Sequence, residues 1–376
     1  MSIDVHSRTP SSTTASTKTG IYGSGVVSPL GIGTEAFAGS IADASPAEAD
    51  VSTMFGDELP TDRGFAIVDF KMKEHVDRKG IRFFDRPTCF GIIASGETLR
   101  ASAGTEVDRV GLVLGTTTGS EKSTSDYSRD TLTQPKPYLV NPATFPNAVM
   151  NCAAGQAAIW HGLTGVNATV AGGQLASIQA LRYAKNSISR GYSDVMVAGA
   201  VEEFSPQRAW AAFGLDRDNP LVAGEGAATF LLAHEDSETA TRASGPIAEL
   251  LATEVGHYGP DIRIRPAGLA AVIDRALLRA GIDRSDVWIV ATGETGVAAY
   301  DHVETEGVET ALPGVERLQI KLLNGETHAA TGALALSAIL ARHRRDPQLH
   351  GRAAVLTAVS PDGAVAAAVV RGFHHG

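Results

Sequence analysis

The stretch Gly165–Ala180, GVNATVAGGQLASIQA, constrains the fold of this chain more than any other. Its first part, Val166–Val170, is a β-branched run with small residues between and predicts a short buried strand. Gly172 and Gly173 then break the strand period, and a helix is predicted from Gln174 onward. The apolar positions that support this helix recur at helical spacing, at Leu175, Ile178 and Leu181.

A strand, a tight turn and a helix in this order form an elbow that presents one side chain at a helix N-terminus. Free backbone N–H groups and the helix dipole stabilise developing negative charge there. Enzymes that use such an elbow place a serine or cysteine nucleophile at its apex. Here the apex residue is Gln174, whose amide cannot attack a thioester. The stretch therefore has the architecture of an active site without its nucleophile.

The composition is that of an ordinary soluble enzyme with one or two domains, at 376 residues. Its 42 acidic and 32 basic side chains give a formal charge of −10, which argues against nucleic acid or an anionic membrane as the main partner. No apolar run reaches the length of a transmembrane helix. Residues 1–18 are rich in Ser and Thr, and we expect a disordered lead there. Two cysteines, Cys89 and Cys152, provide no disulfide framework and favour a reduced, cytoplasmic protein.

Apolar runs and amphipathic segments alternate along most of the chain. Strands are predicted at Val110–Leu114, Asp194–Gly199, Gly224–Leu232, Val287–Ala291, Ala353–Val359 and Ala364–Val370. Helices are predicted at Arg82–Leu99, Cys152–Trp160, Leu269–Ala280 and Ala329–Leu340. Residues 40–80 are polar and irregular and are expected to form a surface excursion. The alternation indicates α/β layers with helices covering largely buried sheets.

Seven motifs, in this order along the chain, resemble the β-ketoacyl synthase family. They are GVVSPLG (25–31), VGLVLGTTTG (110–119), NPATFPNAVMN (141–151), AAGQAAI (153–159), GVNATV (165–170), SDVMVAGAVEE (193–203) and DRDNPLVAGEGAA (216–228). Each is weak alone, but their order and spacing are specific, and the resemblance covers about residues 20–372. It implies a thiolase-like α/β fold with α-β-α-β-α layers and two pseudo-duplicated halves. We place the disordered lead at 1–18 and the halves at 19–240 and 241–373.

The resemblance implies a catalytic cysteine and two histidines, and all three positions hold other residues here. In the family the cysteine takes the acyl chain as a thioester. The imidazoles donate hydrogen bonds to the enolate that forms when a malonyl unit loses carbon dioxide. In this chain Gln174 occupies the cysteine position, Thr292 the first histidine position and Glu326 the second.

The second histidine position admits two alignments. In the family this histidine follows a glycine, five residues after a lysine, and Lys321 and Gly325 keep that spacing, which places Glu326 there. A two-residue deletion before Gly332 would instead make His328 the counterpart. Glu326 is expected to be solvated or paired with Lys321, because a lone buried carboxylate is costly.

Two further family features are altered or shifted. Asp301 and Glu304 match the family's acidic pair with one inserted residue, and the gating loop Gly-Phe-Gly-Gly is replaced by Ser360–Gly363. Cys152 is expected about one secondary-structure element too early to replace the nucleophile.

Two kinds of relative are known to carry glutamine at the nucleophile position. Loading decarboxylases keep both histidines and only remove carbon dioxide from a malonyl thioester. Chain length factors of type II polyketide synthases often carry glutamine and lack the histidines as well. The loss of both histidine positions favours a chain length factor, and a Gln-type decarboxylase that uses Gln174 with His328 is the alternative.

A chain length factor implies two partners. It forms a heterodimer with a Cys-bearing ketosynthase and helps set the length of a polyketide, a polyene among the candidates. The substrate is carried on the phosphopantetheine of an acyl carrier protein, and no other cofactor is expected. No His, Cys, Asp or Glu spacing in the sequence suggests a metal site.

The resemblance also indicates which segments meet the partner. In the family the strand before the elbow pairs with the partner's strand, and the segment preceding it crosses into the partner's tunnel. Candidates at the interface or tunnel are therefore Leu139, Val140, Phe145, Val166 and Val170. For each of them ordinary interface core is the alternative role.

Overall fold

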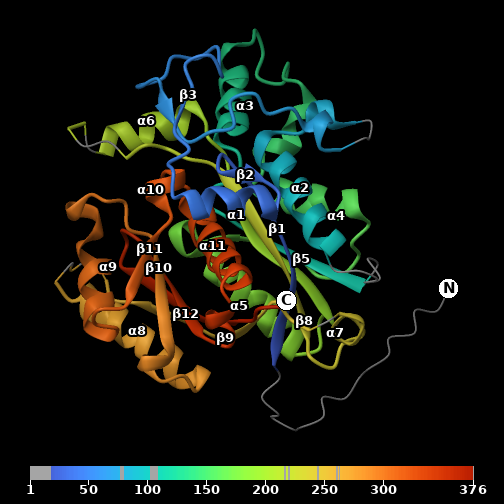
Figure 1. Ribbon diagram of the computed structural model, residues 1–376. Coiled ribbons are helices and arrows are strands. Elements are labelled where there is room, and N and C mark those ends of the chain that lie inside the picture. Colours follow the sequence, from blue (N-terminus) through green and yellow to red (C-terminus); the bar gives the residue numbers. More distant parts are fainter. Residues whose placement is uncertain are drawn as a thin grey trace.

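Two sets of strands with the same spatial order form the framework of the molecule (Figure 1). The computed structural model describes residues 18–76, 80–101, 109–215, 217–218, 221–243, 245–259, 261 and 263–375. The N-terminal set, in the order β6-β5-β7-β8-β1, comprises β1 (Thr19–Ser28), β5 (Val110–Thr116), β6 (Asn167–Ala171), β7 (Val195–Glu202) and β8 (Gly226–His234). The C-terminal set, in the order β11-β10-β12-β13-β9, comprises β9 (Ala248–His257), β10 (Val287–Thr292), β11 (Glu316–Gln319), β12 (Ala353–Val359) and β13 (Ala364–Gly372).

Strand directions repeat between the two sets as well. β5 pairs in parallel with β6 and β7, as β10 does with β11 and β12. The other neighbours within each set are antiparallel. The two sets join where Gly20 and Ile21 of β1 pair with Glu249 and Ala248 of β9. Equal order and equal directions confirm the predicted thiolase-like fold with two pseudo-duplicated halves.

Helices form three layers around the two sheets. α5 (Ala176–Ser189) and α11 (Thr331–Arg345) lie between the sheets and share a core with the inner faces of both. α2 (Arg86–Ala101) and α4 (Cys152–His161) cover the outer face of the N-terminal sheet. The outer face of the C-terminal sheet is covered by α8 (Arg265–Ala280) and α9 (Ala298–Ala311). The layers are therefore α-β-α-β-α, as predicted.

Side chains along the strands alternate between the central and outer cores, as the two-residue period of a strand requires. On β13, Ala366 and Ala368 face the central core, whereas Val365 and Ala367 pack in the core of α8 and α9. Burial on both faces explains why the strands are near-continuous apolar runs in the sequence.

The other elements surround this framework. They are α1 (Thr34–Asp43), α3 (Glu121–Thr133), α6 (Pro206–Leu215), α7 (Glu238–Arg242), α10 (Lys321–Asn324), β2 (Gly31–Ile32), β3 (Ala49–Asp50) and β4 (Arg63–Gly64). The 3₁₀ segments that matter for the site are η4 (Pro142–Ala148), η5 (Gly173–Leu175) and η7 (His328–Ala330). None of the described helices is long and apolar enough to cross a membrane.

Two expectations about the N-terminal region have different outcomes. Residues 1–17 of the predicted lead lie outside the described residues. The expectation that residues 40–80 form a surface excursion is wrong for part of this region, because Val51 and Ala66 are buried in a small core with Phe204. This region is also fastened by the buried Glu225, which accepts the N–H of Ile67 at 2.7 Å.

Candidate functional site

The elbow predicted from the sequence is present between β6 and α5. η5 joins the end of β6 to the start of α5 and carries Gln174. Gly173 has φ 54°, a left-handed conformation that glycine adopts at little cost. A Cβ atom at Gly172 would lie 1.9 Å from Gln179 Oε1, so a side chain there would require the side chain of Gln179 to move. The two glycines therefore allow the sharp turn that presents Gln174 at the apex.

Gln174 is hydrogen-bonded at the apex to both residues that compete for the second histidine position. Its Nε2 lies 3.1 Å from His328 Nδ1 and 3.4 Å from Glu326 Oε1. Glu326 also accepts a 2.7 Å bond from Lys321 Nζ and a 2.8 Å bond from the backbone N–H of His328. Because the amide nitrogen only donates, Nδ1 of the neutral His328 accepts and its ring proton lies on Nε2.

Charges at the apex are neutralised within the chain. Burial opposes ionisation of Glu326, but Lys321 and His328 outweigh it and hold the pKa of Glu326 at about 2. Burial lowers the pKa of His328, and the attraction of Glu326 opposes this effect only in part. At neutral pH the apex therefore holds a Glu326–Lys321 ion pair, as expected from the sequence, and a neutral imidazole.

Thr292 belongs to a separate buried network at the end of β10. Its hydroxyl donates to Glu294 Oε2 at 3.0 Å, and Glu294 also accepts from Arg317 and Gln319. Burial opposes ionisation of Glu294, but its hydrogen bonds and Arg317 lower the pKa overall. The one proton of the Thr292 hydroxyl is therefore already engaged, and this position offers no donor for an enolate.

The acidic pair Asp301 and Glu304 holds the loop that follows β10. Asp301 accepts the N–H of Gly296 at 2.7 Å, and Glu304 accepts the N–H of Gly293 at 2.9 Å. A Cβ atom at Gly293 would lie 3.7 Å from Lys321 Nζ, so this loop borders the apex network. Both carboxylates therefore have structural partners.

The segment at the gating-loop position forms the tight turn between β12 and β13. The N–H of Gly363 donates to the carbonyl of Ser360 at 3.0 Å, and Gly363 has φ 98°. A Cβ atom at Gly363 would lie 2.0 Å from the carbonyl oxygen of Gly259, which excludes a side chain. This turn stands at the position that the family resemblance gives to the gating loop, and its contact with Gly259 holds it in place.

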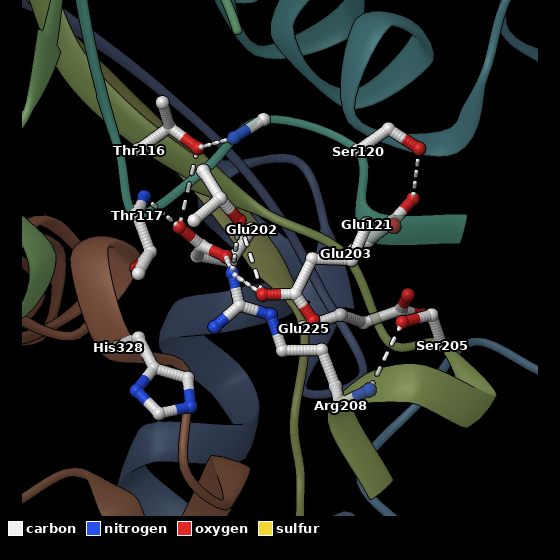
Figure 2. Close-up of polar contacts among 12 residues, drawn as sticks. Thr116, Thr117, Ser120, Glu121, Glu202, Glu203, Ser205, Arg208, Glu225 and His328 are labelled. Atoms are coloured by element: carbon white, nitrogen blue, oxygen red, sulfur yellow. Dashed lines mark hydrogen bonds and ion pairs between the residues drawn. The ribbon is translucent and has the colours of Figure 1, made fainter. Parts of the chain in front are cut away.

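A second buried ion pair lies beside His328 (Figure 2). Arg208 on α6 contacts Glu202 at the end of β7 at 2.5 Å, and both side chains are buried. Arg208 also lies 3.4 Å from Glu121 Oε1, at the start of α3. This pair links the apex to α3 and fills the space beside the imidazole with charged groups.

Glu203 directly follows Glu202 at the end of β7, and its side chain is held on the opposite side of the strand. The Ser120 hydroxyl and the Lys122 backbone N–H each donate to its carboxyl group at 3.0 Å. Burial raises the pKa of Glu203 to about 8. The hydrogen bond from Lys122 lowers this pKa, and the negative charge of Asp85 raises it further. Glu203 is therefore mostly protonated at neutral pH.

Neither cysteine is an activated nucleophile. Burial raises the pKa of Cys89 to about 12 and also raises the pKa of Cys152. The Cys152 sulfur lies 3.6 Å from Thr88 Oγ1 and 3.5 Å from Asn147 Oδ1. Since the thiolate is the attacking form, both thiols are unreactive in these surroundings.

The tunnel and interface candidates lie in two different environments. Leu139 and Phe145, near and within η4, are exposed by 51% and 53%, and Val140 is half-buried. Val166 and Val170 pack against the central core. β6 itself ends the sheet, so one of its edges has no strand partner within the described part of the chain.

Metal binding finds no support in the side-chain arrangement. Among the residues that the structure describes, no group of three or more His, Cys, Asp or Glu side chains could hold a metal ion.

Two protein-family models match this chain. The beta-ketoacyl synthase N-terminal domain matches residues 18–237 and the C-terminal domain matches residues 247–346. The chain belongs to the beta-ketoacyl synthase family. Both matched domains lie on the part of the chain that carries the elbow and the apex network.

Individual relatives cover nearly the whole chain. The 3-oxoacyl-acyl-carrier-protein synthase 2 of Vibrio harveyi is 25% identical, over 84% of this chain and 81% of its own length. The granaticin polyketide beta-ketoacyl synthase 2 of Streptomyces violaceoruber is 25% identical, over 94% and 93%. The solved ishigamide ketosynthase/chain length factor superposes with a TM-score of 0.85 at 30% identity, over 95% of this chain and 99% of the matched chain.

Sequence reasoning missed two features of this beta-ketoacyl synthase site. The Glu202–Arg208 pair and the protonated Glu203 were not expected beside the apex. The signal was the Glu-Glu pair that ends the apolar strand of the SDVMVAGAVEE motif, because consecutive carboxylates at the end of a buried strand require buried partners.

Proposed function

We propose that this chain is a non-catalytic chain length factor that pairs with a Cys-bearing ketosynthase. The observation that carries the proposal is the closed apex, where Gln174 binds Glu326 and His328 and no thiol is activated. An oxyanion donor removed from an enzyme costs roughly 10²–10³ in rate. Here the nucleophile and the donor at Thr292 are both replaced.

The open edge of β6 and the apolar surface beside it support a protein partner. Tyr138, Leu139, Phe145 and Met150 are exposed apolar residues on η4 or close to it in sequence, and Met150 lines the same small void as Thr169 of β6. A strand with unpaired N–H and C=O groups pairs readily with another strand. The family resemblance makes a ketosynthase the partner, with the two edge strands continuing one sheet.

Chemistry then takes place in the partner. The partner's cysteine holds the growing chain as a thioester, and malonyl carrier protein loses carbon dioxide to give an enolate. The enolate carbon attacks the thioester carbonyl, a carbon–carbon bond forms, and the cysteine thiolate leaves. This chain limits product length, because an additional two-carbon unit has no room in a closed tunnel.

Copurification tests the pairing. We expect this chain, produced together with a Cys-bearing ketosynthase encoded beside it, to elute as a one-to-one complex that extends acyl chains on the carrier protein. The isolated chain should not condense. A chain that remains alone in the presence of such a ketosynthase, or that condenses by itself, would contradict the proposal.

The contact between Gln174 and His328 favours a second candidate, a malonyl carrier protein decarboxylase. Gln174 would hold the imidazole through Nδ1, and Nε2–H of His328 would donate to the thioester oxygen as the bond to the carboxylate breaks, carbon dioxide leaves and water protonates the enolate carbon. Carbon dioxide released from malonyl carrier protein by the isolated chain, and lost in His328→Ala, would establish this activity. We expect no release above the uncatalysed rate.

A further inference from the structure

The helix α3 lies on the outside of the N-terminal half, and none of its residues is buried (Figure 1). Its sequence, EKSTSDYSRDTLT, contains Tyr127 and Leu132 as its large apolar or aromatic side chains, and Leu132 is 85% exposed. Most helices in proteins are stabilised by packing an apolar face against a core, and α3 has no such face. Polar contacts therefore hold this helix in place.

Four charged side chains form a closed ring at α3. Lys122 Nζ lies 3.1 Å from Asp57 Oδ2 and 2.8 Å from Asp126 Oδ2. Arg129 contacts the same two carboxylates, at 3.7 Å from Asp57 Oδ1 and 2.8 Å from Asp126 Oδ1. Each carboxylate thus contacts both cations. Isolated exposed ion pairs often contribute nothing to stability, whereas a network of several charges contributes measurably.

Asp57 is the member of this ring that lies outside α3, in a segment with its own attachment to the body of the chain. The aromatic ring of Phe55 stacks on the buried Phe204, with 6.1 Å between the centroids. The indole N–H of Trp210 donates to the carbonyl of Glu58 at 3.0 Å. Asp57 is therefore a fixed point to which the polar helix is attached.

The helix α3 in turn holds η4, the segment that the proposed function assigns to the ketosynthase interface. The rings of Tyr127 and Phe145 lie 5.7 Å apart between centroids. The hydroxyl of Thr124 donates to the carbonyl of Ala148 at 3.4 Å. Because Phe145 is otherwise half exposed, a displacement of α3 removes the side chain against which it rests.

The first turn of α3 is attached in a different way from the later turns. The Ser120 hydroxyl accepts the N–H of Ser123 at 3.1 Å and donates to the buried Glu203 at 3.0 Å. By contrast, the side chains of the ring are partly exposed, from 28% for Lys122 to 55% for Arg129. Salt screens exposed charges much more than buried ones. An increase in ionic strength therefore loosens the ring and leaves the first turn attached.

We propose that the ring of Asp57, Lys122, Asp126 and Arg129 is a salt-sensitive latch that positions η4 for the partner subunit. The proposal rests on the proposed function and adds the element that regulates the same interface. With the ring closed, α3 holds Phe145 where the ketosynthase binds. With the ring open, α3 turns about its first turn, and the apparent affinity for the partner falls in proportion to the closed fraction.

Hydrogen–deuterium exchange of the isolated chain tests the latch without a partner. Asp57→Asn removes one charge of the ring and keeps the shape of the side chain. At low ionic strength we expect exchange in the later turns of α3 to accelerate roughly 3- to 10-fold, because two exposed contacts are lost. The melting temperature should change little. At about 1 M sodium chloride, where the screening length is about 3 Å, the wild type should exchange as fast as the variant.

Glu58→Gln, which neutralises the neighbouring exposed carboxylate outside the ring, is the matched control and should exchange like the wild type. Asp57→Glu keeps the charge and should restore most of the protection. Equal exchange in Asp57→Asn and in the wild type at low ionic strength would overturn the latch.

Binding of the ketosynthase tests the positioning role. We expect Asp57→Asn to weaken binding roughly 3- to 10-fold at low ionic strength, and the difference from the wild type to vanish at about 1 M sodium chloride. Unchanged affinity in a variant whose α3 exchanges faster would overturn the positioning role and leave the chain-length-factor role intact. Failure of the wild-type pair to bind at any ionic strength would instead count against the proposed function.

Discussion

At the scale of single residues, the apex is a polar network whose groups are hydrogen-bonded within the chain. The carboxylate of Glu326 has taken a buried lysine as its partner, and Gln174 spans the space between Glu326 and His328. Each replacement has hydrogen-bond partners in the same chain. The network therefore serves the stability of the elbow and requires no substrate to complete it.

Breaking the apex ion pair should destabilise the fold. Lys321→Met leaves Glu326 buried without its cation, and removing one partner of a buried pair typically costs about 3–5 kcal/mol. We expect urea unfolding to show a loss of this size. The double variant Lys321→Met/Glu326→Leu should recover most of it, and a double variant as unstable as the single one would contradict this role.

Because Glu203 is protonated in the folded protein, the free energy of unfolding should fall as the pH rises. The group ionises near 4.5 when unfolded and at about 8 when folded, so unfolding releases a proton between these values. Stability due to this group is therefore lost as the pH rises through that window. Glu203→Gln cannot ionise, and its melting temperature should gain on that of the wild type from about pH 5 to about pH 9.

If the melting temperatures of the wild type and of Glu203→Gln change in parallel with pH, Glu203 does not cause this dependence. Glu306→Gln, which removes an exposed carboxylate on α9, serves as the control and should run parallel to the wild type.

At the scale of elements, β6 carries the open edge of the sheet on which the proposed pairing depends. Leu112 donates to the carbonyl of Val166, and Gly172 donates to the carbonyl of Thr116, so even-numbered residues of this segment face β5. By the alternation of a strand, the backbone groups of Asn167 and Thr169 face the open edge. These groups are available to a second strand.

A proline at the open edge should separate the subunits without unfolding the chain. Thr169→Pro removes an N–H that faces outward and spares the pairing with β5. We expect the complex with the ketosynthase to dissociate in size-exclusion chromatography, while the melting temperature of the isolated chain changes little. Thr169→Val keeps the N–H and should still assemble, and a stable complex of the proline variant would exclude pairing through β6.

Local patterns predicted the elements with a regular apolar period and failed where such a pattern is absent. α5 and α11 follow from helical spacing, and β12 and β13 from short apolar runs. The core of Val51, Ala66 and Phe204 joins residues that are distant in the sequence, and no local apolar period predicts it. The contact of Gln174 with His328 spans 154 positions and likewise depends on the tertiary fold.

At the scale of the whole molecule, the framework of the family is retained. The repeated strand order, the five layers and the elbow of the family are all present. Gln174, Thr292 and Glu326 are each built into their surroundings by hydrogen bonds. Motif spacing singled these three positions out from the sequence, whereas their hydrogen-bond partners required the fold. A framework retained with an altered centre is what a pairing subunit requires.

The most direct test of this account is condensation by the complex with Gln174→Ala. A non-catalytic subunit predicts that the assembled complex extends acyl chains at nearly the wild-type rate, while alanine at the partner's active cysteine abolishes extension. The comparison needs only the rate of carrier-bound product formation by the two variant complexes. Loss of all condensation in a correctly assembled Gln174→Ala complex would contradict the central claim.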